Sequence, residues 1–315
     1  MSNQERSPDV VQCPPFHHDE VTLAPRVVQL TPRSHISIRR TLPHRDIRTI
    51  GAWCFLDHYG PTNQVNAMSV AAHPHTGLQT VSWLFSGEIE HRDSIGSIQV
   101  INPGELNLMT SGVGIAHSEL SVNGETDLHG IQLWIVLPNP VRHMQPEFAH
   151  HNNLPVFDFG PTSIRLIVGE LLGHNSDAVI YSKLVGAEIN FANAGTIQLP
   201  LDDQYEYGIL VDAGDVHIYG IQVPSGSLHY LPVGKETLEI ASTGTARIIF
   251  LGGEPFKEEV VMWWNFIGRT HDEIVEMRDE WQSQSQKFPV FEDRLGERIP
   301  APAMPNVRLA PRGNR

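Results

Sequence analysis

The sequence predicts an all-β protein made of two antiparallel β-barrels, followed by one short helix near the C-terminal end. Three observations lead to this prediction. Short apolar segments alternate with turns through most of the 315 residues, glycine (26) and proline (23) are abundant, and one order of strands and turns occurs twice. Many short strands joined in this way are typical of barrels and sandwiches, which hide the edges of their sheets.

The composition argues against several classes of protein. A formal net charge of -14 disfavours direct binding to a nucleic-acid backbone, which requires a basic surface. No apolar run approaches the roughly 20 residues that cross a bilayer, and the polar N-terminal residues do not resemble a signal peptide. The two cysteines, Cys13 and Cys54, allow one disulfide but not a disulfide framework. We therefore expect a soluble, cytoplasmic protein with no membrane partner.

The first predicted barrel occupies residues 21–150. Residues 1–20 are polar, contain proline and show little periodicity, so we expect a mobile N-terminal segment. The block from residue 73 to residue 138 contains the clearest strand patterns. Among them, residues 130–137 form one of the most hydrophobic segments of the chain.

The second predicted barrel occupies residues 151–297, after a linker rich in proline and polar residues. Residues 84–106 follow the order strand, glycine turn, strand, strand and glycine turn, and residues 210–228 repeat that order. Strands joined by glycine turns always look somewhat alike, but both copies also contain the tripeptide Ile-Gln-Val. We therefore interpret the two barrels as a duplicated domain.

The only helix that the sequence predicts covers residues 270–286. Thr270 can cap its N-terminus, Glu273 occupies the capping-box position, and acidic residues fill the first turn. Apolar residues at helical spacing predict that one face packs on a barrel. Residues 298–315 contain several prolines and arginines, and we expect an extended tail.

Two pairs of potential metal ligands lie within the first barrel. His73 and His75 form one pair, and His117 and Glu119 form the other, each with one residue between its members. Side chains alternate faces along a strand, so both members of a pair point to the same side. On neighbouring strands, these pairs would place three imidazoles and one carboxylate around one point. Such a set suits a divalent transition metal and leaves positions for water or substrate.

The sequence around these pairs resembles the pirin family, a branch of the cupin superfamily. The resemblance lies in HPHTGLQTV (residues 73–81), GEIEHRD (87–93) and PGELNLMTSGVGIAHSE (103–119). It covers the first barrel closely and the second more loosely, through residues 251–255 and the late helix. It implies a bicupin, in which two double-stranded β-helix barrels lie face to face.

The resemblance also implies that only the first barrel binds metal, as one divalent transition metal per chain, most commonly Fe2+. The implied ligands are His73, His75, His117 and Glu119. Ligand type alone would also allow Mn, Co, Ni, Cu or Zn, and a closed structural zinc site is the alternative to a reactive centre. In the second barrel His217 and His229 each stand alone, so we expect no metal there.

One position departs from the family pattern. Many pirins have glutamate where this chain has Gln79, and glutamine can neither carry a charge nor act as a base. Any role of Gln79 beside the metal would therefore be limited to hydrogen bonding. We expect His91 at the surface. Other residues that could line the barrel mouth, or simply belong to its core, are Trp53, Phe55, His58 and Met109.

The resemblance implies two alternative functions. Bacterial pirins are similar to quercetin 2,3-dioxygenases, which implies cleavage of a flavonol, or of another enolic or phenolic substrate, by O2. Glu119 would then be the candidate general base. Pirins also resemble non-catalytic, iron-dependent redox sensors that regulate protein partners. The same ligands serve both functions, so the sequence leaves both open, and we expect a monomer because two such barrels can be self-sufficient.

Overall fold

The computed structural model describes residues 19–29, 36–122, 124, 126–291 and 293–313. Within these residues the chain forms strands β1 to β26 and one helix, α1. The predicted all-β fold with one short C-terminal helix is therefore confirmed. Residues 1–18, most of the segment predicted to be mobile, lie outside the described residues.

The first barrel consists of a seven-stranded and a four-stranded antiparallel sheet. The larger sheet has the strand order β12-β9-β6-β11-β4-β3-β2 and the smaller one β5-β10-β7-β8. The strands are β2 (Arg26–Gln29), β3 (Ser37–Leu42), β4 (Trp53–Thr62), β5 (Ser69–His75), β6 (Leu78–Ser86), β7 (Ile89–Asp93), β8 (Ile98–Ile101), β9 (Leu106–Thr110), β10 (Ile115–Ser121), β11 (Leu128–Val136) and β12 (Glu147–His151). Central strands such as β11 are buried on both faces, because one face lines the barrel and the other contacts the second barrel.

The second barrel repeats this arrangement. Its larger sheet has the order β1-β22-β19-β24-β17-β14-β13 and its smaller sheet β18-β23-β20-β21. The strands are β1 (Val21–Leu23), β13 (Val156–Phe159), β14 (Thr162–Val168), β17 (Leu184–Phe191), β18 (Gly195–Pro200), β19 (Glu206–Ala213), β20 (Val216–Ile218), β21 (Ile221–Val223), β22 (Leu228–Leu231), β23 (Thr237–Ser242) and β24 (Ala246–Gly253). Strands β6 to β11 thus correspond one by one to β19 to β24, which confirms the predicted duplication.

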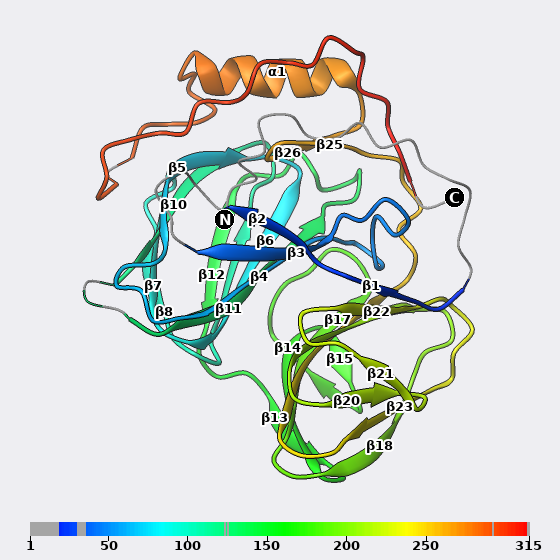
Figure 1. Cartoon of the computed structure of the whole chain (residues 1–315). Coiled ribbons are helices and arrows are strands. Elements are labelled where there is room, and N and C mark those ends of the chain that lie inside the picture. The colour runs from blue at the N-terminus through cyan, green and yellow to red at the C-terminus, as the bar shows by residue number, and fades with distance from the viewer. Residues whose placement is uncertain (1–18, 30–35, 123, 125, 292, 314–315) are drawn as a thin grey trace.

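The two barrels share a core, as their side-by-side position in Figure 1 suggests. One continuous apolar cluster includes Trp53 and Leu133 of the first barrel and Leu210 and Leu251 of the second. The indole of Trp53 also donates across the interface to two backbone carbonyls of the second barrel, at 3.2 and 3.3 Å. The predicted domain boundary near residue 150 stays a prediction. Because the barrels share this core, such a boundary does not separate two independently packed domains.

The two ends of the described chain are exchanged between the barrels. Strand β1, near the N-terminus, pairs with β22 in the second barrel. The hairpin β25 (Val261–Trp263) and β26 (Phe266–Gly268) and the segment after α1 return to the first barrel, through the bridges Thr76↔Phe266 and Ala72↔Arg298. Figure 1 shows α1 and the C-terminal segment above the first barrel, with β1 running down to the second. A further small hairpin, β15 (Glu170–Leu171) and β16 (His174–Asn175), precedes β17.

Helix α1 (His271–Gln282) begins one residue after the predicted start and ends four residues before the predicted end. Thr270 caps it, since its hydroxyl accepts a hydrogen bond from the Glu273 backbone amide at 3.2 Å. The buried residues are Ile274, Met277 and Trp281, which pack on the first barrel as the helical spacing predicts. No helix in the described part of the chain has the length and apolar character to cross a membrane.

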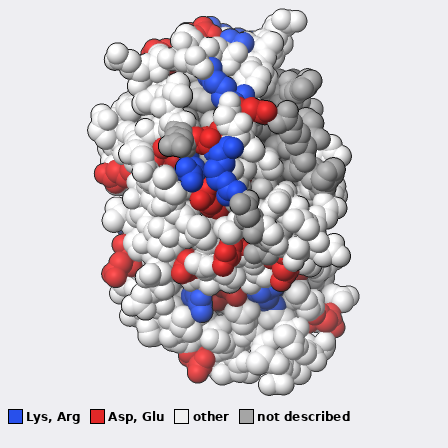
Figure 2. All heavy atoms as spheres, turned by 90° about the vertical axis from the view of Figure 1, so that its left-hand side faces the viewer, with Lys and Arg blue, Asp and Glu red and all other residues white. Residues whose placement is uncertain are grey.

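The charged side chains on one face of the molecule are drawn in Figure 2. Basic residues lie interspersed with acidic ones there, so the described residues of this face form no continuous basic surface. This distribution agrees with the net charge of -14.

Candidate metal centre

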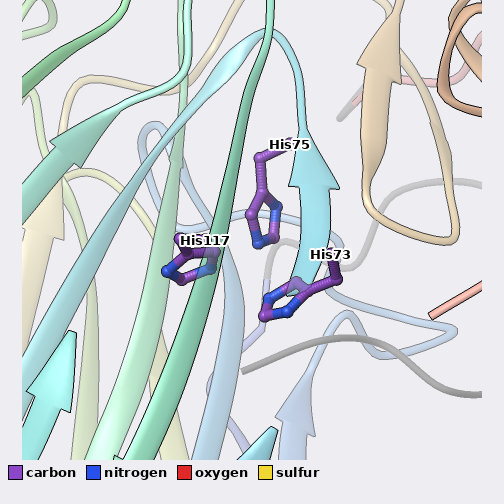
Figure 3. A group of neighbouring side chains, drawn as sticks. All are labelled: His73, His75 and His117. Carbon is purple, nitrogen blue, oxygen red and sulfur yellow. The ribbon is translucent and has the colours of Figure 1, made fainter. Parts of the chain in front are cut away.

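Three histidines meet inside the first barrel. His73 and His75 lie on β5, His117 lies on the adjacent strand β10, and His117 is directly opposite His73. All three are fully buried, and one ligand nitrogen from each lies within 4.8 Å of the others. Figure 3 shows the three rings converging on one region. The two predicted ligand pairs therefore lie on neighbouring strands.

These imidazoles have the protonation state that a metal requires. Burial lowers the pKa of His73 to about 3 and holds the pKa values of His75 and His117 well below the ordinary range. His73 Nδ1 donates to the Ala71 carbonyl at 2.9 Å, so Nε2 of that ring carries the lone pair. The Nε2 atoms of all three rings are buried without a hydrogen-bond partner. Three unpartnered buried nitrogens at one point fit a bound metal ion.

Glu119 lies two residues beyond His117 on β10 and is also buried. Its Oε1 is 3.3 Å from the Ser82 hydroxyl on β6, across the barrel interior. It does not belong to the group whose ligand atoms all lie within 4.8 Å of one another. The structure thus brings the three histidines together, while the predicted roles of Glu119 as fourth ligand and as base stay predictions.

His91 contacts the Nδ1 side of the His117 ring. The Nδ1 atoms of the two rings are 3.3 Å apart, and His91 Nε2 is 3.1 Å from Asp93 Oδ2. A proton on His91 Nε2 is held by the carboxylate, which leaves His91 Nδ1 to accept from His117 Nδ1 and directs His117 Nε2 toward the centre. His91 is only 3% exposed, so the expected surface position is wrong. The reason is that β7 pairs with β10, and the sequence signal was the i, i+2 spacing of His91 and Asp93.

The residues expected at the barrel mouth divide between two faces of the large sheet. Phe55 stacks on Trp134 at 3.9 Å, and the Trp134 ring lies 5.1 Å from His75, so both rings face the interior. Met109 lies opposite Thr80, which in turn lies opposite Trp134, so Met109 shares that face. Trp53 and His58 point instead toward the second barrel, where their hydrogen-bond partners lie.

Gln79 also points away from the histidines. Its Nε2 donates to Thr110 Oγ1 at 2.9 Å and to the carbonyl of Val179, from the second barrel, at 3.1 Å. Gln79 and Ser82 are three positions apart on β6, so their side chains lie on opposite faces of the sheet. Gln79 does act through hydrogen bonds, but these join the barrels and do not reach the histidines.

A second buried group that could bind a metal lies between the barrels. Asp212 Oδ1 is 2.7 Å from the Nε2 atoms of both His58 and His129. Two arginines flank this group, however: Arg39 Nη2 is 2.9 Å from His58 Nε2, and Arg247 Nε donates to Asp212 Oδ2 at 2.7 Å. Burial alone would raise the pKa of Asp212, but hydrogen bonds from the histidines hold it far below its ordinary value. The flanking positive charges favour an inter-barrel ion-pair network here and the histidine triad as the metal centre.

Comparisons with known proteins agree with the predicted resemblance. The family named Pirin matches residues 35–135, and the Pirin C-terminal cupin domain matches residues 186–288. The protein named "Putative quercetin 2,3-dioxygenase PA1205" from Pseudomonas aeruginosa is 39% identical over 311 residues, which cover 97% of this chain and 98% of that protein. A crystal structure of quercetin 2,3-dioxygenase from Acinetobacter baumannii superposes with a TM-score of 0.90 at 36% identity, over 94% of this chain and 98% of that one.

A more distant structure shows the same fold. It is that of bacterial pirin YhhW from Escherichia coli in complex with nickel(II), with a TM-score of 0.59, 16% identity, and coverage of 74% of this chain and 98% of that one. The two family matches, the 39% identical relative and the paired barrels lead to one conclusion. The chain belongs to the pirin family and has its bicupin fold.

Proposed function

We propose that this chain is a metal-dependent dioxygenase that cleaves a flavonol, or a related enolic or phenolic substrate, with O2. One observation carries the proposal: three neutral, fully buried imidazoles direct unpartnered nitrogens at one point inside the first barrel. Two similar proteins that match nearly the whole chain are named as quercetin 2,3-dioxygenases, one of them provisionally.

The proposed ligands are His73, His75, His117 and Glu119. A divalent redox metal held there would supply Lewis acidity and the one-electron chemistry that reactions with O2 require. We propose Fe2+, because nitrogen and oxygen ligands with open positions suit it. The nickel complex of a distant pirin supports a divalent metal in this fold without selecting the element.

The side chains around the centre have distinct proposed tasks. Glu119 would accept the proton of a substrate hydroxyl, since it is a buried carboxylate beside the triad and contacts Ser82. His91 and Asp93 would hold the His117 ring in the tautomer that exposes Nε2. Trp134 and Phe55 would form an apolar wall that excludes water from the reacting groups.

The test uses protein purified without a metal-binding tag. Its metal content is measured first, and metal-free protein is then reconstituted anaerobically with Fe, Mn, Co, Ni or Cu. Quercetin is added in air, and both the loss of flavonol absorbance and the release of CO are followed. We expect turnover with Fe2+. No turnover with any of these metals would refute the proposal for this substrate and favour the regulatory alternative.

A further inference from the structure

A row of polar side chains crosses the large sheet of the first barrel. Each member lies directly opposite the next across a pair of hydrogen-bonded strands. From β3 to β12 the members of this polar row are Arg40, Asp57, Gln132, Ser82, Asn107 and His150. All except His150 are buried. The row faces the barrel interior, because Ser82 contacts Glu119 of the opposite sheet.

Contacts within the row fix how its two amides are turned. Ser82 Oγ donates to Gln132 Oε1 at 2.9 Å, and His150 Nδ1 donates to Asn107 Oδ1 at 2.8 Å. At the end of the row Arg40 holds Asp57 through two hydrogen bonds of 2.7 and 2.8 Å. Both amide carbonyls are therefore occupied, and each amide nitrogen points elsewhere.

The two amide nitrogens have no partner. Gln132 is 1% exposed and Asn107 is 2% exposed, yet Gln132 Nε2 and Asn107 Nδ2 make no hydrogen bond. A buried donor left unpaired costs about 1–3 kcal/mol. The two donors flank Ser82, and therefore lie on either side of its contact with Glu119. Unpaired donors at this position are explained if a ligand with acceptor oxygens pairs with them.

The second barrel shows that the fold does not require polar residues at four of the six positions of this row. Its corresponding row, in the same register, is Leu166, Ala187, Phe250, Ile209, His229 and Thr22. Ile209 stands where Ser82 stands, and Phe250 where Gln132 stands. At the positions of Arg40, Asp57, Gln132 and Ser82 the second barrel thus has apolar side chains, whereas His229 and Thr22 are polar at the positions of Asn107 and His150.

We propose that Gln132 and Asn107 bind substrate oxygens and select a ligand with separate acceptor oxygens, such as a polyphenol. Their strands are two apart, so their Cα atoms are separated by roughly 10 Å, which favours an extended ring system over a small carboxylate. This inference rests on the proposed function, because it takes the histidine triad as the centre that the same ligand reaches.

The test measures binding without turnover. Metal-loaded wild-type protein and the variants Gln132→Leu and Asn107→Leu are titrated anaerobically with quercetin, and tryptophan fluorescence gives Kd. Leucine keeps the side-chain volume and removes the donor. We expect Kd to rise by about tenfold in each variant, with unchanged metal content. The matched control is Gln79→Leu, which removes a buried amide from the opposite face of the same sheet and leaves Kd unchanged.

Two further measurements keep the inference falsifiable. Where a leucine variant does not fold, as judged by its thermal transition, Gln132→Met and Asn107→Ala replace it. The flavonol kaempferol serves as a second probe, because it carries oxygens at both ends of an extended ring system. Wild-type Kd values in both variants, or no binding of either probe to wild-type protein, would overturn the inference. Tight anaerobic binding without oxygen-dependent loss of quercetin would instead refute the proposed function alone.

Discussion

The two barrels have the same strand order and opposite interiors. In the first, the small sheet places His73 opposite His117, whereas in the second the corresponding strands place Ile197 opposite Ile240. The large sheets differ in the same way at their centre, where Gln132 and Ser82 of the first barrel correspond to Phe250 and Ile209 of the second. Equal backbones with unequal interiors indicate that the site is defined by side chains placed on a general scaffold.

This difference has a cost for stability. Buried polar atoms without partners, such as Gln132 Nε2 and Asn107 Nδ2, destabilise the first barrel, whereas the apolar interior of the second stabilises it. The shared core around Trp53 couples the two. We therefore expect corresponding substitutions to have unequal consequences in the two barrels.

The largest expected effect is on metal binding. His117→Ala removes one of three converging imidazoles, so we expect the metal content after dialysis to fall nearly to zero. The corresponding loss of metal affinity should exceed the roughly 100-fold loss that removal of a residue supporting a ligand causes. His217→Ala, in the second barrel, should retain full metal content. Elemental analysis of both variants tests this. Full metal content in His117→Ala would show that His117 is not a metal ligand.

Exchanging the character of the interiors should change the stability of the two barrels by unequal amounts. Phe250→Gln puts an unpartnered amide into the apolar interior and removes a buried ring, so we expect a loss of about 4 kcal/mol. Gln132→Leu, at the corresponding position, removes an unpaired donor and should change stability by less than about 1 kcal/mol. Urea unfolding of metal-free protein measures both. Equal losses would contradict the comparison.

The support behind the triad should have a smaller effect on the metal. His91→Ala removes the acceptor that faces His117 Nδ1, so we expect metal affinity to fall by about 10- to 100-fold. Competition with a chelator of known affinity measures the change. His174→Ala, at an exposed position of the second barrel, is the control. An unchanged metal affinity in His91→Ala would show that His91 only packs against His117 and does not support metal binding.

The last prediction concerns the dependence of stability on pH. Folding lowers the pKa of His73 from its ordinary value of 6.5 to about 3, so below pH 6.5 the unfolded chain binds a proton that the folded chain excludes. The free energy of unfolding of metal-free protein should therefore fall as pH falls from 6.5 toward 3, by about 1.4 kcal/mol per pH unit for this ring.

Urea unfolding at pH 7, 6 and 5 measures this dependence. The variant His73→Asn should show a shallower decrease, because one titrating ring has been removed. The same slope in wild type and variant would show that His73 does not titrate as its burial requires.

Local patterns in the sequence were sufficient for the repeated barrels, the convergence of His73, His75 and His117, and the helix. The i, i+2 spacing of His73 and His75 determines a common face whichever strand lies next to it. The capping residues Thr270 and Glu273 likewise act within a few positions of one another. The pirin resemblance added the face-to-face arrangement of the barrels.

Features that depend on pairing between distant strands could not be predicted in this way. Gln132 and Asn107 are ordinary residues in the sequence, and they become neighbours of Ser82 only through the register of three strands. The burial of His91 follows from the pairing of β7 with β10, and the orientation of Gln79 follows from its place on β6. The contacts of Asp212 with two histidines require the packing of one barrel on the other.

The exchanged ends of the chain have a consequence for how the molecule comes apart. A protease that cut the connection between β12 and β13 would leave β1 of the first fragment in the sheet of the second, and α1 of the second fragment on the first barrel. The two fragments would remain associated, because each contributes an element to the barrel of the other. A gene fragment encoding either half alone would yield a barrel without the element, β1 or α1, that the other half contributes.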